Sequence, residues 1–363
     1  MVPALAIAGA LVERGHPADT VRFVGSRRGI ERRLVPAAGF ALTTLPGRGI
    51  VRRLSWSNVG AVAGLLLGAA QAVVLVGRLR PAVVVSVGGY ASVPCVLAAF
   101  LWRVPVLVAE QNSVPGAANR LAARLGASAA VSFPDTGLPR ATVTGNPVRA
   151  EILAIDHTPA GRVAARARLG VAADAMLIGV ATGSLGARSV NRAVVALAGL
   201  WCDRAGVAIY HVTGERDWAE ISAQAPTGCA LAYRAVRFEE HMELLYAAAD
   251  IMVGRAGASS VAELAVVGVP SVLVPLPGAP GDHQTANAQR LASVGAAIVV
   301  PDEDCDGPRL GATLDALLSQ PEHLASLAES ARAAGRPQAA LDVAHLAEQA
   351  AVSRGRHRGQ PGG

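Results

Sequence analysis

Residues 176–200, MLIGVATGSLGARSVNRAVVALAGL, contain the pattern on which the fold depends. A short apolar run from Met176 to Ala181 is followed by a turn of small residues and then by a helical pattern from Asn191 to Leu200. Apolar strand, small-residue turn and helix form the repeating unit of a parallel sheet covered by helices. We therefore expect a doubly wound α/β domain around this stretch.

The same alternation extends in both directions from this stretch. Further expected strands are 21–25, 82–87, 104–108, 208–212, 251–253 and 271–274. The first series ends at the turn Gly145-Asn146-Pro147-Val148-Arg149, and 363 residues suffice for two domains. We expect domains at 1–147 and 148–336, then a helix at 337–352 that packs back on the first domain, and a disordered tail at 353–363.

Composition excludes several classes of protein. Apolar residues make up 52% of the chain and charged residues 17%, as in globular α/β proteins rather than disordered ones. The net charge is +6, and the chain has arginine but no lysine on the basic side. These arginines are spread along a chain with 4% aromatic residues. Nucleic-acid binders cluster basic residues with aromatic stacking partners, so we expect no nucleic-acid partner.

The four cysteines are far apart and show no metal-ligand spacing. We expect Cys95, Cys202, Cys229 and Cys305 to be small apolar residues in a reducing compartment, and we expect no metal site. Residues 2–11 form the first expected helix, with Pro3 in its first turn, and no signal peptide precedes it. These features predict a cytoplasmic protein.

Residues 59–77 are apolar except for Gln71, a length at which a membrane span is conceivable. A crossover helix between the strands near Leu42 and Val83 is the favoured interpretation, because parallel strands need one there. Arginines and a tryptophan flank the segment, which suits either an anionic bilayer surface or the charged rim of a buried helix. The flanking residues are Arg48, Arg52, Arg53, Trp56, Arg78 and Arg80.

Three strand-to-helix turns in the second half carry candidate chemistry. The first is 181–188, the second 254–263 and the third 275–288. Glycines and exposed amides at helix N-termini suit a diphosphate, and Glu263 suits two ribose hydroxyls. Each turn also has an ordinary interpretation, since Ser260 and Glu263 match a capping box and the other two match common turns or caps.

The three turns, in this order and spacing, resemble the second domain of the MurG family, N-acetylglucosaminyltransferases that convert lipid I to lipid II in peptidoglycan synthesis. First-domain matches are 87–92, 110–119 and 145–149, so the resemblance covers residues 2 to about 349. It implies a GT-B fold, two doubly wound Rossmann-like domains with a cleft between them. It also implies that the first strand of the N-terminal domain, its glycine-rich loop and a histidine would precede residue 1.

The resemblance implies UDP-N-acetylglucosamine and undecaprenyl-pyrophosphoryl-MurNAc-pentapeptide as substrates, no cofactor, and a peripheral seat on the cytoplasmic face of the cell membrane. The implied donor-binding residues are Gly183, Ser184, Arg188, Gly257, Ser259, Glu263, His283 and Gln284. The implied acceptor or cleft residues are Gly88, Gly89, Asn119, Asn146 and Arg149. The implied catalytic residues are Tyr90, Asn112 and Glu110, the last as a base candidate.

Leu185 departs from the family, which usually has glutamine there, and leucine cannot hydrogen-bond a ligand. The implied reaction is inverting transfer to the MurNAc 4-hydroxyl of lipid I, but two alternatives stay open. One is an enzyme of the same fold with another acceptor, or a sugar-nucleotide epimerase. The other is a non-catalytic paralogue that binds UDP-sugar or membrane partners.

Overall fold

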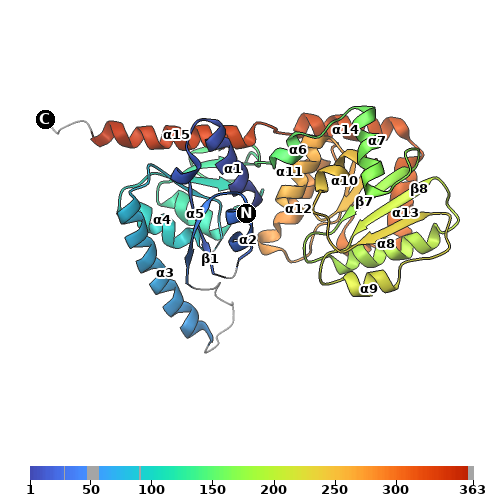
Figure 1. The fold of residues 1–363 in the computed structure, drawn as a ribbon, viewed down its shortest axis with the longest axis horizontal. Helices are drawn as coiled ribbons and strands as arrows, with labels where there is room; N and C mark the ends of the chain where they lie inside the picture. Colours follow the sequence, from blue (N-terminus) through green and yellow to red (C-terminus); the bar gives the residue numbers. More distant parts are fainter. Residues whose placement is uncertain (28, 47–56, 90, 359–363) are drawn as a thin grey trace. The chain divides into compact units, whose positions relative to one another are not determined.

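The computed structural model describes residues 1–27, 29–46, 57–89 and 91–358. Its contacts divide the chain into two compact units. Unit 1 contains residues 1–149 and 337–363, and unit 2 contains residues 150–336. The chain therefore leaves unit 1 once and returns to it through the C-terminal helix (Figure 1).

Unit 2 is built on one parallel sheet, as the sequence predicts. Its strands are β7 (Met176–Ala181), β8 (Val207–Val212), β9 (Ala232–Val236), β10 (Ile251–Gly254), β11 (Ser271–Leu273) and β12 (Ile298–Val299). Within the described residues the order is β12-β11-β10-β7-β8-β9. The chain builds outward from β7 in one direction and then restarts at β10 on the other side of β7. The doubly wound topology is confirmed, and its switch point lies between β7 and β10.

Helices cover both faces of this sheet. They are α6 (Ala150–Leu153), α7 (Pro159–Leu169), α8 (Arg188–Leu200), α9 (Trp218–Ala223), α10 (Met242–Ala248), α11 (Ala258–Val267), α12 (His283–Ala292), α13 (Gly307–Leu318) and α14 (Pro321–Ala334), with 3₁₀ turns η2 (Pro280–Asp282) and η3 (Asp302–Asp304). On one face, Leu197 of α8 and Leu310 of α13 pack against Ile178 and Val253 of the strands. This apolar core holds the strand ends that carry the candidate site.

Unit 1 is also parallel, but its described strands form two sheets. One pairs β1 (Arg22–Ser26) with β2 (Ala41–Leu45), and the other runs β3 (Val84–Ser86), β4 (Val106–Glu110), β5 (Ser128–Val131), β6 (Ala141–Val143). β1 and β3 share no described ladder, although α4 (Ser92–Leu101) packs against both. Leu45 of β2 joins Val106 and Val108 of β4 in one core, so the two sheets share a hydrophobic interior.

The remaining helices of unit 1 cover these sheets. They are α1 (Val2–Glu13), α2 (Glu31–Ala37), α3 (Ser57–Leu79), α5 (Ala117–Arg124) and α15 (Ala339–Arg358), with the 3₁₀ turn η1 (Ala18–Thr20). Figure 1 shows α15 beside α1, where Ile7 packs with Val343 and Ala347 over β4. The helix continues to Arg358, past Ser353, where the sequence predicts the start of a disordered tail.

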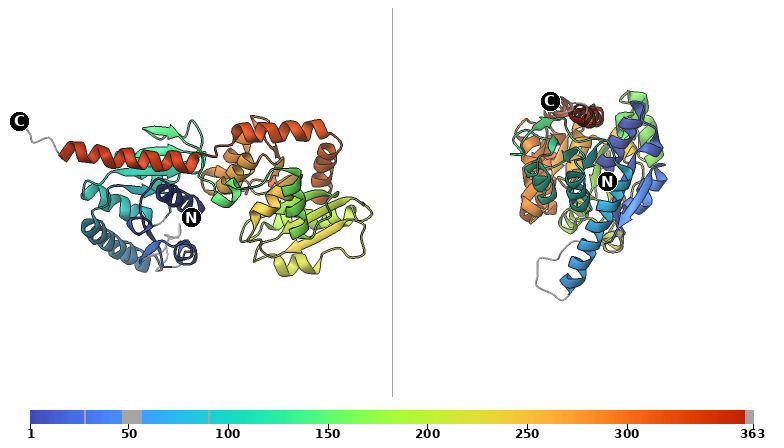
Figure 2. Two further views of the ribbon diagram at one scale, coloured as in Figure 1. Left: turned by 45° about the horizontal axis from the view of Figure 1, so that its top comes forward. Right: turned by 90° about the vertical axis from the view of Figure 1, so that its left-hand side faces the viewer.

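The predicted crossover helix is α3, which joins β2 to β3 and packs beside α4 (Figure 2). In the part of the chain that the structure describes, α3 and the other helices lack the combined length and apolar character that a membrane crossing requires.

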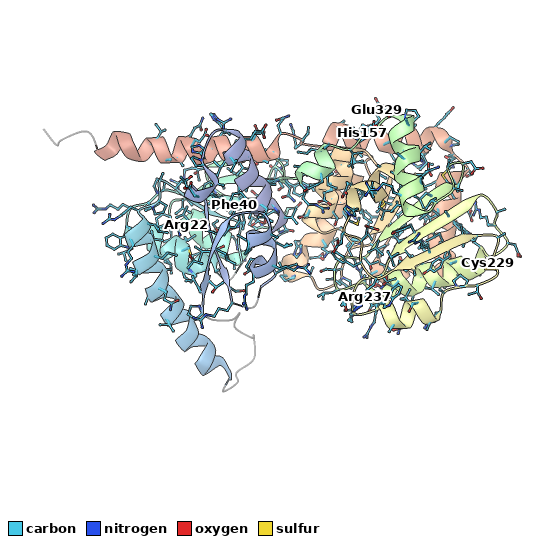
Figure 3. All side chains as sticks on the ribbon, in the orientation of Figure 1. Arg22, Phe40, His157, Cys229, Arg237 and Glu329 are labelled. Carbon is cyan, nitrogen blue, oxygen red and sulfur yellow. A yellow bond between two sulfur atoms is a disulfide. The ribbon has the colours of Figure 1, made fainter. Side chains whose placement is uncertain are left out.

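The prediction of four isolated cysteines is wrong for two of them. Cys202 and Cys229 form a disulfide with Cα atoms 4.7 Å apart, and Figure 3 labels Cys229 in the loop that leads into β9. The Cys202 carbonyl accepts hydrogen bonds from the amides of Ala230 and Leu231, which brings the two thiols together across 27 residues of chain. Cys95 and Cys305 are buried free thiols, and burial raises the pKa of each to about 11.

Candidate active site

The three predicted turns of unit 2 leave the same edge of the sheet. The strand register places Val212, Ala181, Gly254 and Leu273 in one row at the carboxyl ends of β8, β7, β10 and β11. Gly254 lies so close to β7 that an added Cβ would stand 2.4 Å from the carbonyl oxygen of Ala181. Ligands of doubly wound folds bind outside this edge at the switch point, which is where the first two turns meet.

The first turn, residues 182–187, is called the donor loop here, after the ligand that the sequence predicts for it. Gly183 and Gly186 adopt φ of +84° and +88°, a conformation that other residues rarely take. α8 begins directly afterwards, with Ala187 as an N-cap that offers no side-chain hydrogen bond to the first amides. The loop contains Ser184 and Leu185, and Arg188 is the first residue of α8. Leu185 is 68% exposed, and the Arg188 side chain is 62% exposed.

The second turn follows β10 and leads into α11. The N-cap of α11 is Gly257, again without a side-chain cap, so Ser259 and Ser260 lie inside the first turn of the helix. The capping-box alternative is therefore wrong, since it requires Ser260 at the N-cap. Glu263 is 5% exposed, and its Oε2 accepts a hydrogen bond of 3.1 Å from the Tyr246 hydroxyl.

Arg255 joins the second turn to its neighbours through hydrogen bonds. Its Nη1 donates to the carbonyl oxygens of Val274 and Pro275, each at 3.1 Å, and pairs with Asp302. Its Nη2 donates to Ser189 of α8 at 3.0 Å. This one side chain therefore joins the second turn to the start of α8 and to the third turn.

The third turn follows β11 and leads through η2 into α12. Gln284 lies in the first turn of α12, and its Oε1 accepts a hydrogen bond of 3.0 Å from the amide of Leu276. His283 Nδ1 lies 2.9 Å from the carbonyl oxygen of Pro280. All of the predicted donor-side residues thus lie at or directly beyond one edge of one sheet.

A polar cluster beneath the donor loop was not singled out from the sequence. It consists of Asn191, His211, Thr213, Asp217 and Tyr233, of which Asn191, His211 and Thr213 are 0% exposed. One signal in the sequence could have revealed it: a histidine, His211, lies inside the apolar strand run 207–212. Buried polar groups in native proteins are paired, so a histidine in a buried strand indicates polar partners nearby.

In unit 1, Glu110 is 3% exposed and organises the loop after β4. Its Oε1 accepts hydrogen bonds from the backbone amide and side-chain amide of Asn112, at 3.0 and 3.3 Å. Its Oε2 accepts from Gly116 N and Asn119 Nδ2, both at 2.9 Å. Asn119 in turn accepts from the Ser86 hydroxyl, so this network joins the ends of β3 and β4.

Three of the other unit 1 predictions, Gly88, Gly89 and Asn146, follow strands at the same carboxyl edge. Gly88 and Gly89 follow β3 with φ of +82° and +87°. Asn146 follows β6 and is 4% exposed, and neither polar atom of its side chain has a hydrogen-bond partner within the described residues. Arg149 is half-buried, and Tyr90 lies outside the described residues.

The predicted membrane patch is described only in part. Arg52, Arg53 and Trp56 lie outside the described residues. Arg78 is exposed on α3, and Arg80 stacks 4.4 Å from the ring centroid of Trp102. The exposed face of α3 carries Leu67 and Val74, which are 53% and 52% exposed.

A shallow hollow of about 410 Å³ lies between α3 and β2, lined by Thr43, Leu45, Ala70, Gln71, Val74, Leu75 and Arg78. Elsewhere, within residues that the structure describes, histidine, cysteine and carboxylate side chains form no group of three or more able to hold a metal ion.

Known proteins match both units. The glycosyltransferase family 28 N-terminal domain matches residues 1–131, and the C-terminal domain of the same family matches residues 177–345. Relatives from Desulforudis audaxviator, Clavibacter sepedonicus and Frankia casuarinae are 37%, 40% and 38% identical. The alignments cover 96–98% of this chain and 94–95% of the relatives. Each relative is named a UDP-N-acetylglucosamine–N-acetylmuramyl-(pentapeptide) pyrophosphoryl-undecaprenol N-acetylglucosamine transferase.

Solved structures agree with this assignment. The crystal structure of MurG from Acinetobacter baumannii matches with a TM-score of 0.74 at 30% identity, over 96% of this chain and 95% of that one. A UDP-GlcNAc 2-epimerase from Neisseria meningitidis matches with a TM-score of 0.68, but at 13% identity it shows the fold alone. Because both of its domains and nearly all of its length match in this way, the chain belongs to the MurG family of glycosyltransferase family 28, with two Rossmann-like domains of the GT-B fold.

Proposed function

We propose that this protein transfers N-acetylglucosamine from UDP-N-acetylglucosamine to the MurNAc 4-hydroxyl of undecaprenyl-pyrophosphoryl-MurNAc-pentapeptide, forming lipid II with inversion. The observation that carries this proposal is the near full-length identity of 37–41% to relatives whose names state this transfer. The epimerase alternative rests on the shared fold, which many activities use.

Unit 2 suits the donor. The N-termini of α8 and α11 flank the switch point, and neither has a side-chain cap, so their first amides suit the two phosphates of UDP. Arg188 adds a positive charge at the start of α8. Glu263 lies two positions beyond the first turn of α11, where its carboxylate suits the ribose hydroxyls. Ser184, Ser259, His283 and Gln284 complete the proposed donor edge.

The chemical step is a single displacement at the anomeric carbon. The acceptor oxygen forms a bond to C1 while the bond from C1 to the UDP oxygen breaks, and UDP leaves with the electron pair. The proton of the acceptor hydroxyl passes to a base during this step. Helix N-termini and Arg188 stabilise the charge that develops on the departing diphosphate.

Glu110 is poorly suited to be that base. A carboxylate offers about four lone-pair positions, and Glu110 already accepts four hydrogen bonds. Gaining a proton would require the loss of one of them. We assign Glu110 instead to positioning Asn112 and Asn119 on the acceptor side. The unpaired amide of Asn146 supports a polar ligand at the same edge.

The test is transfer of labelled N-acetylglucosamine from UDP-N-acetylglucosamine to a lipid I analogue with a short prenyl chain. Labelled disaccharide product, with stoichiometric release of UDP, is the expected result. UDP binding without any transfer would favour the non-catalytic alternative. Conversion of the donor to its 2-epimer, without need of acceptor, would favour the epimerase.

We also propose that the exposed face of α3 lies on an anionic membrane surface. Leu67, Ala70 and Val74 share one helical face, and Arg78 follows one turn later. An exposed apolar face that ends in arginine suits an anionic interface. The opposite side of α3 packs against α4. One helix can therefore serve both as the crossover between strands and as the proposed membrane-facing surface.

Sedimentation with vesicles tests this surface. Phosphatidylglycerol vesicles should bind the protein, and the double variant Leu67→Gln/Val74→Gln should bind several-fold less. The control is Val163→Gln, since Val163 is 49% exposed on α7 of unit 2. Equal binding by all three proteins would contradict the proposal.

A further inference from the structure

The loop after β8, residues 213–217, packs directly against the donor loop and is called the clamp loop here. Gly214 has φ of +81°, and an added Cβ there would stand 2.2 Å from the amide nitrogen of Gly186. A Cβ on Gly186 would stand 2.5 Å from the carbonyl oxygen of Thr213 and 2.7 Å from Asp217 Oδ2. The backbones of the two loops are therefore in direct contact, so a movement of the clamp loop would move the donor loop.

Hydrogen bonds join the two loops at both ends. Glu215 N donates to the carbonyl oxygen of Ser184 at 3.1 Å. Arg216 Nη2 donates to the carbonyl oxygen of Gly186 at 3.1 Å, and the Thr182 hydroxyl donates to the carbonyl oxygen of Thr213 at the same distance. The donor loop is thus held along its length by the clamp loop.

Asp217 is the centre of this contact. Its side chain is 1% exposed, and it accepts hydrogen bonds from Arg216 Nε at 2.6 Å and from Asn191 Nδ2 at 3.0 Å. Arg188 Nε lies 3.6 Å from the same carboxylate. The hydrogen bond from Arg216 is the main reason that the pKa of Asp217 lies below its ordinary value, so the group is charged at neutral pH.

A buried chain of side chains fixes Asn191 behind this carboxylate. Asn191 Nδ2 faces two acceptors, Asp217 and the Thr213 carbonyl, so its Oδ1 must accept from His211 Nε2 at 2.9 Å. His211 Nδ1 then accepts from the Tyr233 hydroxyl at 2.8 Å. Burial lowers the pKa of His211 to about 3, which keeps the ring neutral and this pattern intact at physiological pH.

We propose that Asp217 is a positioning residue for the donor diphosphate: it holds the Gly186 end of the donor loop, and the guanidinium of Arg188, in the geometry that binds phosphate. Asp217 itself does not contact the donor, since a second negative charge beside a diphosphate would repel it. The inference rests on the proposed function only for the identity of the donor.

The experiment measures the dissociation constants of UDP and uridine by calorimetry and competition, together with KM for each substrate. Asp217→Asn removes the charge and places amide hydrogens against Arg216 and Asn191. We expect UDP affinity to fall about tenfold or more, with uridine affinity unchanged because uridine has no phosphate. KM for the donor should rise while KM for the lipid acceptor stays constant.

Two further variants keep this test decisive. Arg216→Met removes the hydrogen bonds from Arg216 to the Gly186 carbonyl and to Asp217. The Arg216 side chain is 47% exposed, so folding should be preserved while UDP binds about threefold more weakly. Asp315→Asn is the control, because it breaks an exposed ion pair between Asp315 of α13 and Arg204, which follows α8. It should leave both ligand affinities unchanged.

Equal losses of UDP and uridine affinity, or no loss of either, would overturn the proposal, as would a wild-type protein that binds no UDP. Failure of the proposed transferase activity is distinguishable from these results. In that case UDP binds the wild-type protein and responds to Asp217→Asn, but no sugar reaches the lipid acceptor.

Discussion

At the residue scale, Glu110 shows how a carboxylate can resemble a catalytic base and be used to organise a loop. Its four hydrogen bonds come from Asn112, Gly116 and Asn119, and three of the four donors are close in sequence to β4. Such a residue fixes the positions of others, in the proposed function those of Asn112 and Asn119 on the acceptor side. Its replacement should therefore affect folding before chemistry.

The first prediction concerns Glu110→Gln. Glutamine presents an amide NH₂ to at least one of these donors, so unit 1 should lose about 1–3 kcal/mol of stability. Thermal unfolding followed by circular dichroism measures the loss. Glu13→Gln, on the exposed end of α1, is the matched control. A variant that keeps its melting temperature but loses activity, together with the fall of kcat at low pH that protonation of a base causes, would instead support a base.

The second prediction concerns Glu263 and its partner Tyr246. Glu263→Gln keeps an oxygen to accept the Tyr246 hydrogen bond but loses the negative charge proposed to bind the ribose hydroxyls. Donor KM should rise about tenfold, with little change for a donor that lacks the ribose hydroxyls. Tyr246→Phe removes the phenolic hydroxyl alone and should change KM far less. Equal effects of the two variants would assign Glu263 a purely structural role.

At the element scale, α1 and α15 form a pair that closes one face of the unit 1 sheet. Small residues allow the helices to approach, with Ala10, Ala340 and Ala344 in a common cluster. At one end, Glu348 accepts hydrogen bonds from Arg14 at 2.6 Å and from His16 at 2.9 Å, and His345 also lies beside it. This polar contact should make the pairing sensitive to acid.

The third prediction follows from the pKa of Glu348. Hydrogen bonds from Arg14 and His16 lower this pKa from 4.5 to about 2. A carboxyl whose pKa is depressed by folding stabilises the folded state above its unfolded pKa and loses that effect as the pH falls toward its folded pKa. The wild-type protein should therefore melt above Glu348→Gln at pH 7, and the difference should shrink between pH 4.5 and pH 2. Glu322→Gln on α14 is the control, and a difference independent of pH would contradict this account.

At the scale of the whole molecule, the chain crosses between its units twice, because α15 belongs with residues 1–149. Unit 1 is therefore discontinuous in sequence, whereas unit 2 is one continuous segment with its own core. The disulfide Cys202–Cys229 lies wholly inside unit 2, between the end of α8 and the loop before β9. Its effect should be confined to that unit.

The fourth prediction concerns this disulfide. Alkylation after denaturation without reductant should modify two thiols, those of Cys95 and Cys305, and with reductant it should modify four. Reduction should lower the stability of unit 2 by about 2–4 kcal/mol, seen as a lower melting transition in dithiothreitol. The double variant Cys202→Ser/Cys229→Ser should melt at that lower temperature with or without reductant. Four alkylated thiols in the absence of reductant would contradict the pairing.

Prediction from the sequence was accurate where local pattern decides structure. β7 has the predicted bounds, and the apolar segment at 59–77 lies within α3, because strand and helix patterns depend on neighbours a few residues apart. The three strand-to-helix turns of unit 2 were predicted for the same reason, and their role in donor binding stays a prediction. The cysteine pair was missed because 27 residues separate two thiols that only the packing of α8 and the loop before β9 brings together. His211 was missed because its partners come from α8, β9 and the clamp loop.

By itself, the sequence determined the alternation of strands and helices, the glycine turns and the resemblance to one glycosyltransferase family, since each is written in local spacing and residue type. Tertiary structure alone decided that β7 and β10 are neighbours, which aligns three turns into one edge. It also decided that Glu110 is saturated with hydrogen bonds and that Asp217 lies beneath the donor loop. These outcomes depend on which side chains meet across long chain separations, and such contacts are settled by packing and hydrogen-bond geometry rather than by local pattern.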